Sequence, residues 1–237
     1  MSFLDKAGHS LIGVGVYTVP QAARLVHLPV ATVEGVVATR PDSNAPPRTY
    51  PIVFAELDLG FGDKIITFHG LMELWVAAQL RAAGIPWPTI RLAAFEAARI
   101  LKTPHPLSAG RLRTERQRIF MELRQAKHHP KTVIDLLTRQ QEFEDVIDRS
   151  LGPDIIVRDR DGQIRKWFPL GIKFSVVLDP ERRFGEPTDP DSGVPTVSLT
   201  EAYHAEGGNI AVAARWFDTS KKAVRDAVRF EEWLNRP

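Results

Sequence analysis

The chain of 237 residues contains no cysteine. This excludes disulfide bonds, thiolate nucleophiles and cysteine-based zinc sites, and it is compatible with a reducing compartment. No apolar run in the sequence approaches the roughly 20 residues that a membrane-spanning helix needs. The first residues also lack the pattern of a signal peptide. We therefore expect a cytoplasmic protein with no membrane association.

The common motifs of catalytic sites are also absent. The sequence contains no glycine-rich phosphate loop, no nucleophile elbow and no zinc-protease helix. Asp145 and Asp148 share one helix face, but a divalent metal site needs further carboxylates from other elements. His128 and His129 are adjacent, so on a helix their side chains diverge. We expect no enzymatic activity, no catalytic residue, no cofactor and no bound metal.

Charge is nearly balanced along the chain. With 31 Lys and Arg against 29 Asp and Glu, the formal net charge is only +2. No global electrostatic field therefore attracts this protein to nucleic acid, and any binding surface must come from local clustering of charge. The 43% of hydrophobic residues are enough for one large core or two modest ones.

The most informative segments are two candidate helix-turn-helix motifs, the first at residues 17–38. Thr18 is suited to cap a helix that runs to Val26, Pro29 interrupts the chain, and a second helix is expected at 30–38. This second helix has no Lys or Arg and carries Glu34, so it offers little to DNA phosphates. Packing is the favoured interpretation of this motif, with base recognition as the alternative.

The second motif, at residues 199–230, is more basic. Gly207 and Gly208 end one helix, Asn209 is suited to cap the next, and Thr219 or Ser220 to cap a third. The basic residues of the third helix are Lys221, Lys222, Arg225 and Arg229. A basic helix directly after a capped turn is typical of a phosphate-facing recognition helix. A solvated basic face remains the alternative.

Between the motifs, the pattern predicts short strands at 52–59 and 64–68 as a small wing, then helices at 71–83 and 87–101. Residues 111–123 are predicted to form a β-hairpin, which either follows a phosphate backbone or is a solvated edge. Its arginines, the densest positive charge in the chain, are Arg111, Arg113, Arg116 and Arg118. An amphipathic helix at 132–151, a hairpin at 155–168 turned at Asp161-Gly162 and a strand at 172–178 follow.

Several strings resemble known families. YTVPQAARLVHLPVATVEGVV resembles the first two helices of a MerR-like winged helix-turn-helix. RRFGEP, SGVP and EGGNIAVAARWFDTSKKAVRDAVRFEEWL are similar to the antitoxin-associated domain of unknown function of VapB-type proteins, with Gly185, Glu186 and Pro187 matching its first element. The middle strings resemble longer members of this group. The resemblance implies an antitoxin that is partnered with a PIN-domain-like ribonuclease and represses its own operon as a dimer.

Together these patterns predict a mainly α protein with small β-hairpins, of the α+β class. We expect a MerR-like winged helix-turn-helix and dimerisation region at 1–130, and a C-terminal helical bundle with the second helix-turn-helix at 131–237. The expected DNA contacts are the four basic residues of the third helix, the four hairpin arginines, Thr219 and Ser220. The expected partners are double-stranded operator DNA, a PIN-like ribonuclease toxin and a second copy of the chain. The alternative is an interaction protein that sequesters a partner without binding DNA.

Overall fold

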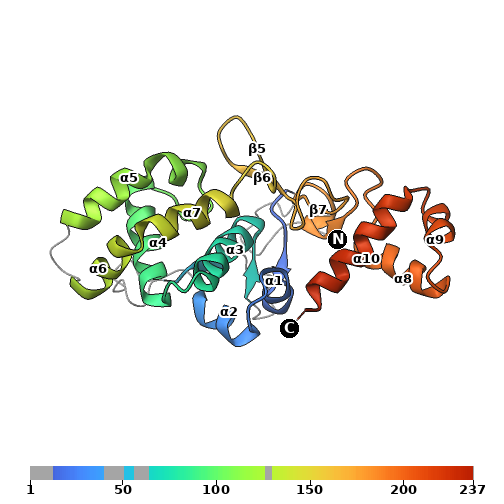
Figure 1. Ribbon diagram of the computed structural model, residues 1–237, viewed down its shortest axis with the longest axis horizontal. Helices are drawn as coiled ribbons and strands as arrows, with labels where there is room; N and C mark the ends of the chain where they lie inside the picture. The colour runs from blue at the N-terminus through green and yellow to red at the C-terminus, as the bar shows by residue number, and fades with distance from the viewer. Residues whose placement is uncertain (1–12, 40–50, 56–63, 126–129, 237) are drawn as a thin grey trace.

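The computed structural model describes residues 13–39, 51–55, 64–125 and 130–236, and the structural statements below concern these residues. They form ten α-helices and eight short strands, so the expected class, mainly α with small sheets, is confirmed. The molecule is elongated, with α5 and α6 at one end and α8, α9 and α10 at the other (Figure 1). None of the described helices is long and apolar enough to cross a membrane.

The first two helices form where the sequence predicts them. Helix α1 (Val19–Val26) begins at a capping box, in which the Thr18 hydroxyl accepts the Gln21 N–H and the Gln21 side chain accepts the Thr18 N–H. Pro29 precedes α2 (Val30–Val36). The second helix is shorter than expected, because Val37 already belongs to strand β2 (Val37–Thr39).

The predicted wing is wrong. Strand β3 (Val53–Ala55) pairs in parallel with β2, whereas β4 (Ile65–Ile66) pairs antiparallel with β1 (Tyr17–Thr18). The two predicted strands therefore belong to different sheets. Apolar alternation identifies a strand but carries no information about its partner. Residues 56–63, where the turn of the wing was expected, lie outside the described part of the chain.

Helices α3 (Phe68–Ala82) and α4 (Trp87–Leu101) build the centre of the main core. On α3, Leu71, Leu74, Ala78 and Leu80 are buried. Trp75 is half-buried and donates its indole N–H to the Ser150 carbonyl over 3.2 Å. The single helix expected at 132–151 is wrong, because α6 (Pro130–Thr138) and α7 (Gln140–Ser150) are separated at Arg139. Both helices pack on α5, but α6 also packs on α4, whereas α7 also packs on α3.

The predicted basic hairpin at 111–123 is also wrong, because these residues lie in helix α5 (Gly110–Gln125). Leu112, Ile119 and Phe120 are buried, and their spacing of seven and eight residues marks one face of a helix. Glu115 reinforces the helix, since Arg111 lies 3.3 Å and Arg118 3.6 Å from its carboxylate. The polar residues between these apolar positions had suggested the alternation of a strand instead of the period of a helix.

The C-terminal half begins with a four-stranded antiparallel sheet in the order β5, β6, β7, β8. Strands β5 (Ile156–Arg158) and β6 (Ile164–Trp167) form the predicted hairpin, with Gly162 at a φ of 79° in its turn. The strand expected at 172–178 is confined to β7 (Val177–Leu178). After β8 (Pro187–Thr188) follow the helices α8 (Thr196–Ala205), α9 (Ile210–Trp216) and α10 (Lys221–Leu234).

A strained turn between β7 and β8 forms hydrogen bonds with the N-terminal strand and so connects the two halves of the molecule. In the short 3-10 helix η2 (Arg183–Gly185) all three residues have positive φ, at 45° for Arg183, 54° for Phe184 and 84° for Gly185. Left-handed backbone costs a residue with a side chain about 1–2 kcal/mol. The N-terminal strand stabilises the turn, because the Val16 N–H donates to the Phe184 carbonyl (2.9 Å) and the buried Tyr17 hydroxyl donates to the Gly185 carbonyl (2.8 Å). Burial, followed by the charge of Asp179, raises the pKa of Tyr17 well above its usual range.

Gly185→Ala tests this junction, because a Cβ at residue 185 would lie 2.1 Å from the Tyr17 hydroxyl oxygen. We expect a loss of at least about 3 kcal/mol in the free energy of unfolding, from overpacking together with backbone strain. The matched control is Gly193→Ala, which has a similar φ of 69° but open space around the new methyl group, and should cost about 1 kcal/mol. Urea denaturation measures both. Equal losses would show that Tyr17 does not constrain the turn.

A buried carboxylate lies at the centre of the main core. Glu73 on α3 is fully buried and accepts the N–H groups of Leu107 (3.0 Å) and Ser108, which fixes the segment before α5. Burial raises the pKa of Glu73 to about 7, and the nearby His105 and the hydrogen bonds to Ser108 and Leu107 lower it only in part. The neutral form of this carboxyl is therefore favoured by folding.

The stability of the protein should depend on pH through Glu73. Because its pKa rises from 4.5 to about 7 on folding, its stabilising contribution is complete below pH 4.5 and is lost as the pH rises to 7. The loss should be about 3 kcal/mol over this window. We expect the difference in unfolding free energy between wild type and Glu73→Gln to change by this amount, in urea titrations across the pH range. A flat difference, like that expected for the exposed Glu201→Gln, would contradict the assignment.

Candidate nucleic-acid interface

The three C-terminal helices form a small unit with its own core of Leu199, Val224 and four alanines, at positions 213, 214, 223 and 227. The small alanine side chains allow the helices to approach closely. The predicted helices, glycine stop and caps are all present in this unit. Asn209 accepts the N–H groups of Ala211 (3.1 Å) and Val212 (3.2 Å), and Ser220 accepts the N–H of Ala223 (3.0 Å).

The turn between α9 and α10 has a defined geometry. Asp218 has a φ of 48°, and the Thr219 N–H donates to the Ala214 carbonyl over 3.0 Å. The Thr219 hydroxyl lies 3.4 Å from Asp189 and from Ser192, so it faces the segment after β8. The Ser220 hydroxyl accepts the Ala223 N–H, as the N-cap of α10. Of these two predicted contacts, Thr219 therefore turns inward, and Ser220 sets the start of α10.

The structure divides the four predicted cations of α10 into two pairs. Lys222 lies 2.6 Å from the Asp226 carboxylate and 3.1 Å from the Ser175 hydroxyl. The Arg229 guanidinium lies over the Phe174 ring, 4.8 Å from its centroid. Both side chains thus fasten α10 to the segment at residues 172–175.

Lys221 and Arg225 form the other pair. Both are exposed, and their four-residue spacing places them one above the other at the start of α10. They line a shallow hollow together with residues 207–211, the turn between α8 and α9. Because α10 begins here, its first backbone N–H groups and the positive end of its dipole lie beside the same two cations. This end of α10 is suited to hold an anion such as a phosphate group.

The arginines of α5 do not join this surface. Arg111 and Arg118 are exposed and share Glu115, and the side chains of Arg113 and Arg116 lie outside the described part of the structure. Helix α5 lies at the opposite end of the molecule from α9 and α10 (Figure 1). One copy of the chain therefore does not bring the two predicted basic sets together.

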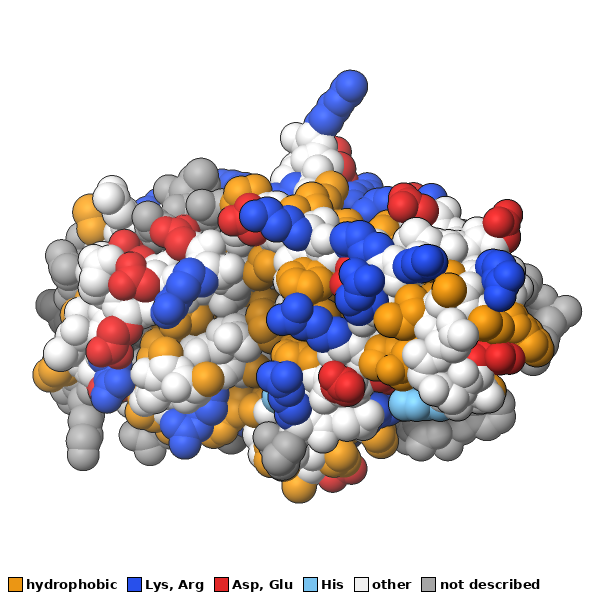
Figure 2. All heavy atoms as spheres, turned by 45° about the vertical axis from the view of Figure 1, so that its right-hand side comes forward, with side chains coloured by type: hydrophobic (Ala, Val, Ile, Leu, Met, Phe, Trp, Pro, Cys, Tyr) orange, Lys and Arg blue, Asp and Glu red, His pale blue; other side chains and the backbone are white. Residues whose placement is uncertain are grey.

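Other exposed basic side chains lie on the sheet that precedes the C-terminal helices. Figure 2 shows Lys and Arg side chains gathered over the middle of the face that carries this half of the molecule. Exposed cations of the sheet and its turns are Arg160, Arg165, Lys173, Arg182 and Arg183. In the sequence these cations are scattered among acidic and apolar residues, so they form no recognisable basic motif. The adjacent pair Arg182 and Arg183 was the one local signal.

No cluster of three or more histidine, aspartate or glutamate side chains suited to a metal ion occurs in the described residues. The interface therefore has charged and hydrogen-bonding groups but no metal centre within that part of the chain.

Comparison with known proteins adds information on the fold. No family model matches the chain, and no curated protein sequence matches it significantly. Among solved structures, the chain is similar to the crystal structure of Rv2018 from Mycobacterium tuberculosis, with a TM-score of 0.68 and 22% sequence identity. The match covers 92% of this chain and 98% of Rv2018. At this identity the likeness establishes a shared fold over nearly the whole chain.

Proposed function

We propose that this protein is a cytoplasmic antitoxin that binds operator DNA as a homodimer and neutralises a PIN-domain-like ribonuclease. The observation that carries the DNA-binding part is the exposed pair Lys221 and Arg225 at the start of α10, directly after a capped turn. In helix-turn-helix proteins the start of the second helix contacts the DNA.

The geometry supports phosphate contacts more than base recognition. Two cations beside a helix N-terminus attract a phosphate oxygen whatever the sequence of the DNA. Exposed cations of the sheet and its turns add further positive charge to this half of the molecule, where Figure 2 shows Lys and Arg side chains gathered. In this proposal Lys222 and Arg229 act indirectly, because their contacts with Ser175 and Phe174 hold α10 in place.

The antitoxin part of the proposal rests on the resemblance of residues 182–234 to the antitoxin-associated domain. One structural observation is compatible with it. Trp216 at the end of α9 is 70% exposed and follows the exposed Arg215. Tryptophan and arginine are enriched among the residues that dominate protein–protein binding energy. We propose that this end of α9 contacts the ribonuclease.

The second candidate function is an interaction protein that sequesters its partner without binding DNA. The observations that favour it are the contacts of Lys222 with Asp226 and of Arg229 with Phe174, and the helix α2, which presents Glu34 and no cation. Both candidates share the surface around Trp216. They differ in the affinity for promoter DNA when the partner is absent.

The DNA-binding proposal predicts that the double variant Lys221→Gln/Arg225→Gln loses affinity for the DNA upstream of the gene. Two lost phosphate contacts should lower the slope of log K against log salt by about 1.8 and weaken binding at low salt by roughly tenfold or more. Fluorescence anisotropy over a salt series measures both quantities. The matched control is Arg111→Gln/Arg118→Gln on α5, which should leave the slope unchanged. Wild-type protein that does not prefer promoter over random DNA would establish the second candidate instead.

The antitoxin proposal predicts a complex with the protein encoded by the neighbouring gene, which should be a ribonuclease. Trp216→Ala should weaken this complex at least tenfold, because a large aromatic anchor is lost. The control Ile172→Ala removes another exposed apolar side chain, 51% exposed, from a different element. Titrating ribonuclease activity with each variant measures the affinity. Full ribonuclease activity in the presence of excess wild-type protein would refute the antitoxin assignment.

A further inference from the structure

A cleft with a volume of about 430 Å³ lies where the N-terminal and C-terminal parts of the chain meet. Its walls come from α1, from the turn η2 and from helices α8 and α10. Small-molecule sites typically have volumes of roughly 300–1,000 Å³ and are frequent at such junctions. The cleft is therefore large enough for a small organic ligand.

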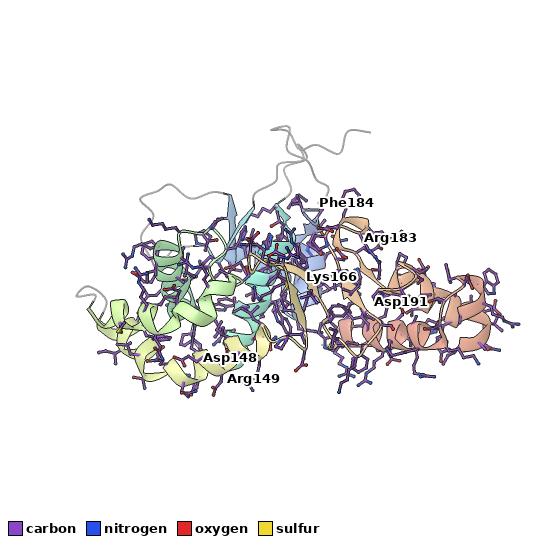
Figure 3. The ribbon with its side chains drawn as sticks, turned by 90° about the horizontal axis from the view of Figure 1, so that it is seen from above. Asp148, Arg149, Lys166, Arg183, Phe184 and Asp191 are labelled. Carbon is purple, nitrogen blue, oxygen red and sulfur yellow. The ribbon has the colours of Figure 1, made fainter. Side chains whose placement is uncertain are left out.

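The strained turn forms one side of this cleft. Arg183 and Phe184 are both exposed, with 39% of the Phe184 surface accessible, and both line the cleft. Figure 3 shows the two residues next to each other, between the N-terminal elements and the C-terminal helices. Backbone strain of this kind persists only where surrounding contacts maintain it, and it is concentrated at functional sites. Here Val16 and Tyr17 maintain it and keep an arginine and an aromatic ring at the opening.

Groups of both charges line the same cleft. The cations are Arg24 on α1 and Arg183 on the turn, and the carboxylates are Glu186 after the turn and Glu231 on α10. Two of these groups are held in place: Arg24 donates to the Asn235 side chain (3.1 Å), and Glu231 accepts from Thr196 (2.6 Å). The apolar part of the lining includes Leu25, Val197 and Leu234.

This mixture of charges restricts the ligand. A wholly apolar molecule would remove water from four charged groups and return no hydrogen bond. A ligand with a single charge would be attracted by one pair of side chains and repelled by the other. A ligand with a positive and a negative group close together can form ion pairs with the glutamates and the arginines at the same time. Its side chain can then pack on the apolar residues of the lining.

We propose that this cleft binds a small zwitterion with an apolar side chain, of the size of a free α-amino acid or a dipeptide. Arg183 and Arg24 bind the ligand carboxylate, and Glu186 and Glu231 bind its ammonium group. The side chain of the ligand packs between Phe184 and the aliphatic wall. This site is separate from the surface formed by Lys221, Arg225 and Trp216, and the proposal does not depend on DNA or ribonuclease binding.

Isothermal titration calorimetry with three related compounds tests the proposal on the full chain. L-phenylalanine carries both charges, 3-phenylpropionate lacks the ammonium group, and 2-phenylethylamine lacks the carboxylate. We expect saturable binding of L-phenylalanine, at least about tenfold tighter than that of either analogue, since each analogue leaves one pair of side chains without its partner. The dipeptide Leu-Phe, titrated in parallel, distinguishes the two ligand sizes. Equal binding of the single-charge analogues, or no binding of any compound up to about 10 mM, would overturn the proposal.

Two variants place the binding in this cleft. Val197→Trp fills the cleft from an exposed position on α8 and should abolish binding, whereas Ile172→Trp, at an exposed position outside the cleft, should not change it. Arg183→Gln should weaken binding about tenfold and have little effect on 2-phenylethylamine. Circular dichroism confirms that each variant is folded. Binding that survives Val197→Trp unchanged would refute the assignment of the site.

Discussion

The contact between Tyr17 and Gly185, 168 residues apart, organises the molecule. The buried hydroxyl of Tyr17 needs a hydrogen-bond partner, which is the carbonyl of Gly185. A glycine is required at residue 185, because a Cβ there would collide with the hydroxyl group and ring of Tyr17. This contact joins the turn η2, between β7 and β8, to strand β1 directly before α1. It also positions Arg183 and Phe184 at the opening of the cleft. The strain in the turn is thus balanced by the hydrogen bonds that the N-terminal strand donates to it.

Helix α10 continues this connection. Its first half packs with α8 and α9 in the small alanine-rich core, and its last residues, Phe230 and Leu234, enter the main core. Trp233 contacts the ring of His27 at the end of α1, with ring centroids 4.3 Å apart. One helix therefore links the surface proposed to bind DNA with the cleft proposed to bind a zwitterion.

The four cations of α10 differ in whether they contact another part of the protein. Lys222 contacts the Ser175 hydroxyl and the Asp226 carboxylate on α10 itself, and Arg229 lies over the Phe174 ring. Lys221 and Arg225 face solvent. Sequence spacing places all four on one broad side of the helix, and the difference between the pairs arises from the single segment that packs there. All four side chains are exposed, but Lys222 and Arg229 already have partners within the protein, whereas Lys221 and Arg225 are available to another molecule.

The sequence by itself determined the helices whose ends carry their own signals. The Thr18 capping box, the Asn209 and Ser220 caps and the Asp161-Gly162 turn are local, because each depends on atoms within a few residues. They placed α1, α9, α10 and the β5–β6 hairpin, and they identified the basic residues of the candidate interface. The tertiary structure decided the rest. Strands β3 and β4 pair with β2 and β1 and not with each other, and α6 and α7 are separate helices that pack on α4 and α3, respectively. The partners of Lys222 and Arg229 and the walls of the cleft depend on segments brought together by folding, and no local pattern encodes which distant atoms will meet.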